Sequence, residues 1–191
     1  MTNAWMDVCD EKENLCRLID ILVDINLEII KRYAQLGVDG YFMFDDWGLQ
    51  TSLMISPDSW REIWKPRYKR IFDAAHAHGI DTFLHSCGYI TDILGDLIEA
   101  GLDVIQMDQQ VNMGLQNLHD KFAGKITFFS PADIQQILPT NDEQLIKTYC
   151  RDMINLLGTE NGGFIAKWYN DPEGVGHTEK AIRAMAEEFS R

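Results

Sequence analysis

Apolar residues follow two kinds of spacing along the chain, and these spacings predict a series of helices and strands. One set recurs at steps of three and four, with one longer gap, and comprises Leu15, Leu18, Leu22, Ile25, Ile29 and Leu36. Because Gly37 follows this set, it predicts an amphipathic helix of about seven turns that ends at a glycine. Short apolar runs bounded by turn residues predict five buried strands, at 41–44, 82–85, 103–107, 125–129 and 163–168.

Capping and proline signals place helices between these strands. Ser56 followed by Pro57 is typical of a helix start, and Pro66 is expected to kink or restart that helix. Asn141 with Gln144 three residues later predicts a capping box, and Thr178 is expected to cap the last helix. Strands thus alternate with helices five times after an initial helix. This order predicts an α/β fold with a parallel sheet buried on both faces.

Length and composition favour one globular domain spanning residues 1–191. The chain has 191 residues, of which 46% are hydrophobic and 25% charged, as in ordinary globular domains. The N-terminus lacks the basic and apolar stretches of a signal peptide, so a cytoplasmic location is expected. Four cysteines occur without a CxxC pair, which indicates free thiols.

Charge and missing motifs exclude several classes of function. Seventeen Lys and Arg residues against 30 Asp and Glu residues give a net charge of -13. Because such a surface repels phosphate groups and anionic lipids, neither a nucleic acid nor a membrane is expected as a partner. The sequence has no glycine-rich phosphate loop and no GxSxG motif, so nucleotide binding and serine hydrolysis are unsupported.

Polar residues gather directly after the predicted strands. In parallel βα folds, functional sites lie at the carboxyl ends of the strands. The catalytic candidates there are Asp45, Asp46 and His85. The candidates for contact with a small-molecule substrate are Trp47, Gln106, Asp108, Trp168 and Tyr169.

His85 and Cys87 form the sharpest chemical signal. Residues i and i+2 of a strand face the same side, so the imidazole and the thiol can converge. This pair of donors suits zinc, although a free buried cysteine beside a hydrogen-bonded histidine is the alternative. The third ligand is not identified, with Asp108 as one candidate and His177 or Tyr169 as weaker ones.

The adjacent carboxylates Asp45 and Asp46 are candidates for a base, a substrate clamp or a metal ligand. Adjacent residues of an extended segment face opposite ways, so one of the two is expected to face the site. A hydrogen-bonded pair that only fixes the loop is the alternative.

Four segments together resemble the uroporphyrinogen decarboxylase family. They are residues 44–48, the helix that begins at Ser56 and Pro57, residues 83–88 and residues 100–106. The resemblance implies a (β/α)₈ barrel. The family contains tetrapyrrole decarboxylases and zinc-dependent methyltransferases that act on corrinoids or thiols.

The resemblance to the methyltransferase branch implies zinc bound by His85 and Cys87. It also implies a small thiol substrate oriented by Asp45 or Asp46, and a corrinoid protein as the methyl donor. These methyltransferases use a further cysteine after the last strand, where this chain has Lys-Trp-Tyr-Asn-Asp-Pro at 167–172. The alternatives are a porphyrin-pathway carboxy-lyase, in which an aspartate stabilises a cationic intermediate, and a truncated, non-catalytic binding or assembly piece.

The number of predicted strands falls short of this fold, since a (β/α)₈ barrel has about 250 residues. Residues 1–191 are therefore expected to be the C-terminal part of such a barrel. They are expected to form a homo-oligomer or to associate with a missing N-terminal part. An open flavodoxin-like sheet, which needs no further strands, is the alternative.

Overall fold

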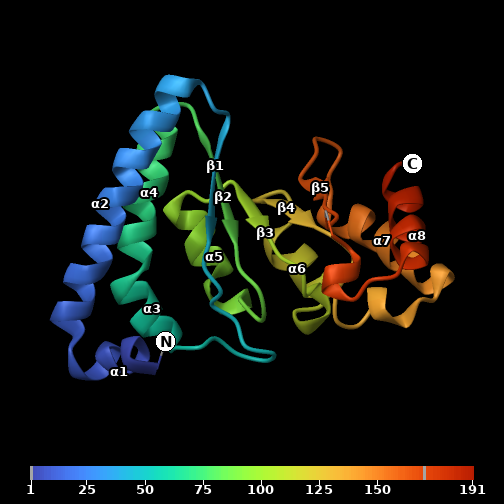
Figure 1. Cartoon of the computed structure of the whole chain (residues 1–191), viewed down its shortest axis with the longest axis horizontal. Coiled ribbons are helices and arrows are strands. Elements are labelled where there is room, and N and C mark those ends of the chain that lie inside the picture. Colours follow the sequence, from blue (N-terminus) through green and yellow to red (C-terminus); the bar gives the residue numbers. More distant parts are fainter. Residues whose placement is uncertain (1, 170) are drawn as a thin grey trace.

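The computed structural model describes residues 2–169 and 171–191, and the five strands in these residues form one parallel sheet (Figure 1). The strands lie side by side in chain order and pair in parallel throughout. They are β1 (Gly40–Phe44), β2 (Asp81–His85), β3 (Val104–Gln106), β4 (Thr127–Ser130) and β5 (Phe164–Ala166). This sequential order differs from the flavodoxin-like order 2-1-3-4-5, so the open-sheet alternative is excluded.

Helices connect the strands, as the sequence pattern predicts, but two helices precede the sheet where the pattern predicts one. They are α1 (Thr2–Asp10), α2 (Lys12–Leu36), α3 (Pro57–Ile63), α4 (Lys65–His76), α5 (Thr91–Ala100), α6 (Leu115–Phe122), α7 (Glu143–Leu157) and α8 (Glu179–Phe189). None of these described helices combines the length and the apolar character that crossing a membrane requires.

Local signals explain several of the helix starts. The Ser56 hydroxyl accepts a hydrogen bond from the Ser59 amide, and the Thr178 hydroxyl accepts one from the Ala181 amide. Pro66 lies in the first turn of α4, so the chain restarts its helix there. These observations confirm the predicted caps at Ser56 and Thr178 and the predicted restart at Pro66.

The predicted cap of α7 was wrong by one residue. Asp142 is the cap, because its Oδ1 accepts hydrogen bonds from the amides of Gln144 and Leu145, at 3.0 Å and 3.1 Å. Asn141 instead adopts a left-handed conformation with φ 55° that ends the preceding turn. Its carboxamide oxygen accepts a hydrogen bond from the Thr178 hydroxyl.

Helices cover one face of the sheet. Tyr41, Met43, Leu84, Ile105 and Phe128 point to this face, and all five belong to the main hydrophobic core. The opposite face carries Phe42, Phe44, Phe83, Phe129 and Ile165, none of which belongs to that core. Burial of both faces was therefore predicted wrongly. The apolar runs place side chains on both faces of the sheet, but among the described residues helices cover only one of these faces.

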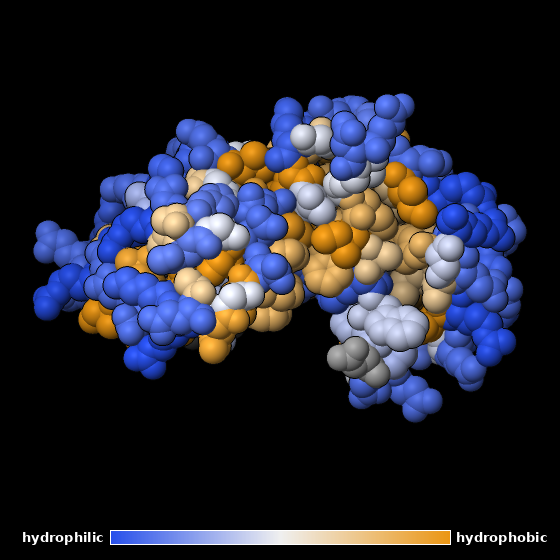
Figure 2. Space-filling view, turned by 90° about the horizontal axis from the view of Figure 1, so that it is seen from above, coloured by the Kyte–Doolittle hydropathy of each residue, from blue (hydrophilic) through white to orange (hydrophobic). Residues whose placement is uncertain are grey.

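The sheet is strongly curved, with the uncovered face on the inside of the curve. The ring centroids of Phe42 on β1 and Phe129 on β4 lie 6.4 Å apart, although β2 and β3 separate these strands. Three strand spacings in a flat sheet would be about 14 Å. Figure 2 shows apolar residues over the middle of the molecule, around a hollow between two more polar ends. The curvature is that of an arc of barrel wall.

Candidate metal and substrate site at the strand ends

Two glycines bring the loops after β1 and β2 into direct contact. The Gly48 amide donates a hydrogen bond to the Cys87 carbonyl at 3.1 Å, and the Tyr89 amide donates to the Leu49 carbonyl at 2.8 Å. A Cβ atom on Gly48 would lie 2.4 Å from the carbonyl carbon of Gly88. The close approach therefore requires glycine, and it places the loop of β1 beside Cys87.

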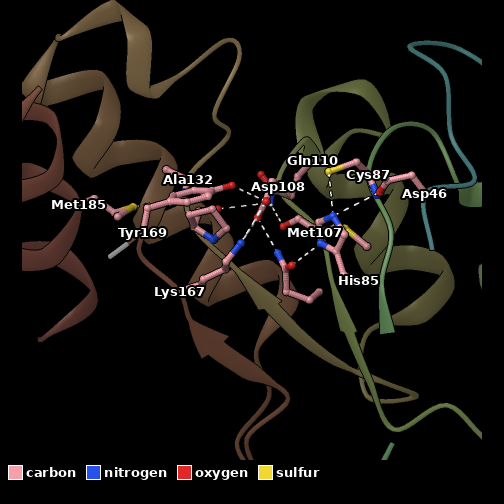
Figure 3. A network of polar contacts seen from close by, with 12 residues as sticks. Asp46, His85, Cys87, Met107, Asp108, Gln110, Ala132, Lys167, Tyr169 and Met185 are labelled. Carbon is pink, nitrogen blue, oxygen red and sulfur yellow. Dashed lines mark hydrogen bonds and ion pairs between the residues drawn. The ribbon is translucent and has the colours of Figure 1, made fainter. Parts of the chain in front are cut away.

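Asp46, His85 and Cys87 converge at this contact (Figure 3). His85 Nε2 lies 3.3 Å from Cys87 Sγ and 3.3 Å from Asp46 Oδ1. The Cys87 amide donates a hydrogen bond to Asp46 Oδ1 at 2.8 Å, which fixes the carboxylate over the loop of β2. The three potential ligand atoms all lie within 4.8 Å of one another. His85 is 16% exposed and Asp46 55%, so the cluster opens to solvent on the Asp46 side.

Asp45 and Trp47 point away from this cluster. Asp45 Oδ2 accepts a hydrogen bond from the Tyr68 hydroxyl at 2.6 Å, and Trp47 Nε1 donates to the same hydroxyl at 2.8 Å. Trp47 is buried against Trp60 and Trp64. Burial raises the pKa of Asp45 above its ordinary value, and the Tyr68 hydrogen bond offsets part of that shift. The structure thus separates the two adjacent aspartates, with Asp46 alone facing the cluster.

A second polar group lies beside the cluster and is centred on Asp108, which is 3% exposed (Figure 3). Lys167 Nζ donates to both carboxylate oxygens of Asp108, at 2.9 Å and 3.0 Å, and the Tyr169 hydroxyl donates to Oδ2. Gln106 Nε2 donates to Oδ1 at 2.5 Å, while the other end of the Gln106 amide contacts His85 Nδ1. Asp108 therefore joins the ends of β3 and β5.

The remaining candidates lie outside both groups. Trp168 is exposed, and no described polar contact joins it to the cluster. His177 packs edge-on against Tyr169, with ring centroids 5.6 Å apart. Burial lowers the pKa of His177 below its ordinary value, so the ring is neutral at pH 7.

Burial also sets the protonation of the thiol. It raises the pKa of Cys87 to about 12, and the negative charges of Asp108 and Asp46 add to the effect. Burial and the Asp108 hydrogen bond raise the pKa of Tyr169 far above its ordinary value. Without a metal, Cys87 is thus a neutral thiol at pH 7. Metal binding would have to displace its proton, because the thiolate is the ligand.

The donor set of the cluster fits zinc. One carboxylate oxygen, one imidazole nitrogen and one sulfur are ligands that Zn²⁺ accepts, and three protein ligands leave a fourth tetrahedral position open. The donor beside His85 and Cys87 is Asp46, whereas Asp108 lies in the neighbouring group. Asp46 precedes Cys87 by 41 residues. Only the pairing of β1 with β2 could have shown that Asp46 lies beside Cys87 and His85.

Comparison with known proteins assigns the chain to a family. A family model described as uroporphyrinogen decarboxylase (URO-D) matches residues 1–167. A uroporphyrinogen decarboxylase from Nocardia farcinica is 28% identical over 96 residues, which cover 50% of this chain and 26% of that protein. The methylcobamide:CoM methyltransferase MtbA from Methanosarcina mazei is 26% identical over 112 residues, which cover 58% of this chain and 32% of that protein.

A solved methyltransferase from Methanosarcina mazei matches the whole chain with a TM-score of 0.74 at 16% identity. This chain covers 54% of that structure, and its fold is the corresponding part of a barrel. The chain thus spans about half the length of this relative, and the matched segments span less of the two curated ones. Because the family model matches residues 1–167 of 191, the chain belongs to the uroporphyrinogen decarboxylase (URO-D) family.

Proposed function

We propose that this chain carries the metal site of a methyltransferase-like member of the URO-D family, and that residues 1–191 are one domain from the C-terminal part of its barrel. In this proposal Asp46, His85 and Cys87 hold a zinc ion and leave one position for a small thiol substrate. The single observation that carries it is the convergence of three suitable ligand atoms within 4.8 Å of one another. The identity to MtbA, a methylcobamide:CoM methyltransferase by name, supports methyl transfer with a corrinoid-bound donor.

A zinc ion bound there would lower the pKa of a substrate thiol and hold it as the nucleophilic thiolate. The chain's own residues would bind and orient that substrate. Phe44, whose ring lies 5.9 Å from the His85 ring, gives the cluster an apolar wall. Lys167 and Tyr169 would meet the polar end of the substrate, since they lie beside the cluster in the segment that follows β5. Asp46 would hold the metal from the solvent-exposed side of the cluster.

Metal analysis tests the proposal directly. Protein purified without added metal should contain about one zinc per chain, as a site with three protein ligands requires. His85→Ala and Cys87→Ser should lose the metal, and Asp46→Asn should bind it more weakly. Cys9→Ser is the matched control, because Cys9 is an exposed thiol far from the cluster along the chain. Less than about 0.2 zinc per chain in the unaltered protein would contradict the metal site.

Decarboxylation is the second candidate, favoured by the 28% identity to a uroporphyrinogen decarboxylase. The charges of the site argue against it. Lys167 is neutralised by Asp108, and Asp46 faces the same open side, so a substrate with many carboxylates would meet uncompensated negative charge. Two assays followed by mass spectrometry distinguish the candidates. Methylation of a small thiol by methylcobalamin would favour methyl transfer, and turnover of a porphyrinogen would favour decarboxylation. A chain that does neither while binding metal would favour a binding or assembly role.

A further inference from the structure

We infer that Gln106 and Asp108 are positioning residues that hold His85 with its proton on Nδ1, so that the lone pair of Nε2 faces Asp46 and Cys87. The inference concerns the same cluster as the proposed metal site and rests on it for its functional meaning. It depends on the directions of the hydrogen bonds that link His85 to Gln106 and Gln106 to Asp108. Figure 3 labels His85 and Asp108 at the two ends of this chain of contacts.

The direction of the chain of hydrogen bonds is set at Asp108. A carboxylate only accepts hydrogen bonds, and Asp108 receives them from Lys167 and Tyr169. The Gln106 atom that faces Asp108 at 2.5 Å must therefore be the amide nitrogen. The oxygen of the Gln106 amide then faces His85 Nδ1, and because this oxygen only accepts, Nδ1 must carry the proton.

Burial fixes the direction of these hydrogen bonds. Gln106 is 2% exposed and Asp108 3%, so water cannot replace either partner. If His85 carried its proton on Nε2, then Nδ1 and the Gln106 oxygen would be two buried acceptors facing each other without a proton between them. Buried polar groups left without a partner are strongly unfavourable. Strand pairing keeps the contact in register, because His85 on β2 is the partner of Gln106 on β3.

In the neutral tautomer with its proton on Nδ1, Nε2 is the ring nitrogen that carries the free lone pair. Nε2 is also the atom that lies 3.3 Å from both Cys87 Sγ and Asp46 Oδ1. The ring is thus prepared to bind a cation before any cation arrives. Histidine ligands in metal sites are commonly fixed in this way by a partner on the other ring nitrogen.

The same contacts remove Gln106 and Asp108 from the surface that meets a substrate. Asp108 accepts from Gln106, Lys167 and Tyr169, and Gln106 uses both ends of its amide. Both side chains are almost fully buried, at 2% and 3% exposed, and each of their polar ends already has a partner within the protein. The sequence had suggested both as substrate contacts, whereas the hydrogen bonds assign them to support His85 and Lys167.

The tautomer of His85 can be measured without a metal, a substrate or a known reaction. Long-range ¹H–¹⁵N spectra of the metal-free protein distinguish Nδ1–H from Nε2–H rings. The signals of His85 are identified by their loss in His85→Ala. We expect a single Nδ1–H form in the unaltered protein. Gln106→Leu should shift the ring toward the Nε2–H form, which free histidine favours.

Cobalt binding gives a second measurement. The affinity for Co²⁺, followed by its visible absorption, should fall about 10- to 100-fold in Gln106→Leu, as for other outer partners of metal-binding histidines. Gln116→Leu is the matched control, because Gln116 is an exposed glutamine on α6. The double variant Gln106→Glu with Asp108→Asn reverses the hydrogen bond between positions 106 and 108, because the asparagine amide donates to the glutamate, but it keeps at position 106 an oxygen that accepts from Nδ1–H. It should restore the Nδ1–H form and much of the affinity.

An Nε2–H ring in the unaltered protein would overturn the inference even if Gln106→Leu failed to fold. So would an Nδ1–H ring or an undiminished Co²⁺ affinity in folded Gln106→Leu. Failure of this inference can be distinguished from failure of the proposed function. An Nδ1–H ring that depends on Gln106, in a protein that binds no zinc, would leave the positioning role intact and remove the metal site.

Discussion

At the scale of single residues, the site depends on a glycine contact as much as on its polar groups. Gly48 and Gly88 touch backbone to backbone, and a Cβ atom on Gly48 would also lie 2.4 Å from the Tyr89 amide nitrogen. Backbone atoms cannot move aside as a flexible side chain can. Any side chain at Gly48 must therefore push the loop carrying Asp46 away from the loop carrying Cys87.

Substitution of Gly48 should weaken metal binding without removing a ligand. We expect Gly48→Ala to lower the affinity for Co²⁺ at least about 10-fold, because Asp46 would lose its place over Cys87. Gly95→Ala is the control, since its added Cβ would meet nothing nearer than a Phe122 ring atom at 3.8 Å and alanine favours the helix α5. Equal Co²⁺ affinities of the two variants, measured by titration, would contradict the role of the contact.

Residue patterns predicted one part of the site and missed another. The i and i+2 spacing of His85 and Cys87 predicted their convergence, and strand alternation predicted that only one of the two aspartates would face them. The supporting roles that we propose for Gln106 and Asp108 could not be predicted in this way. Lys167 lies 59 residues beyond Asp108 and donates to both of its carboxylate oxygens. These oxygens are therefore not free to accept hydrogen bonds from a substrate.

At the scale of elements, Asp103 ties a helix and two strands together at the amino ends of the strands. Its Oδ2 lies 2.7 Å from His76 Nε2 at the end of α4, and accepts hydrogen bonds from the Thr82 amide and hydroxyl of β2 at 2.7 Å and 2.9 Å. Burial alone would raise the pKa of Asp103. The hydrogen bonds from His76 and Thr82 outweigh it and hold the pKa below the ordinary 3.8.

The lowered pKa of Asp103 predicts a stabilising effect that acid removes. A carboxyl whose pKa is lower in the folded state stabilises the fold fully above its ordinary pKa, and this contribution disappears as the pH falls through the folded-state value. Asp103→Asn should therefore lower Tm at pH 5, and the difference from the unaltered protein should shrink below pH 3.8. Thermal unfolding from pH 5 to pH 2.5 measures it. Asp81→Asn is the control: it alters an exposed carboxylate on β2 and should leave Tm unchanged. An unchanged Tm for Asp103→Asn at pH 5 would contradict the stabilising role of Asp103.

Element order was predictable because its signals are local. Ser56, Pro66 and Thr178 act within one helical turn, so their positions alone place three helix starts. The cap of α7 was misplaced because Asn141 and Asp142 are both good capping residues. Only the left-handed backbone of Asn141 and its hydrogen bond from Thr178 decide between them, and that bond joins segments 37 residues apart.

At the scale of the whole molecule, apolar surface remains uncovered on α2 and on the concave face. Several α2 side chains from the predicted periodic set are about half exposed or more, namely Leu18, Leu22, Ile25 and Leu36. The helix buries Leu15 of that set, together with Val23 and Ile30, which lie outside it. Apolar residues occupy more than one side of α2, so spacing alone could not decide which side meets the sheet. Association with a second copy, or with further barrel strands, stays a prediction that sedimentation can test.

A pair of substitutions on α2 distinguishes its exposed and buried sides. Ile25 is 51% exposed and Ile30 is fully buried, so lysine should be tolerated at the first position alone. We expect Ile25→Lys to change the free energy of unfolding by less than about 0.5 kcal/mol and to reduce self-association. Ile30→Lys should cost several kcal/mol, because it buries an unpaired charge. Similar denaturant midpoints for the two variants would contradict this placement of α2.

The three ligands of the proposed metal site all come from one stretch of chain, from the segment after β1 to the loop after β2. Asp46 and Cys87 are 41 residues apart, whereas the bonds of Asp108 to Lys167 and Tyr169 span 59 and 61 residues. Pairing of β1 with β2 therefore suffices to bring Asp46, His85 and Cys87 together. The contact of His85 with Gln106 also needs β3, and the contacts of Asp108 need the segment after β5. The three candidate ligands thus depend on a smaller part of the sheet than the residues around them.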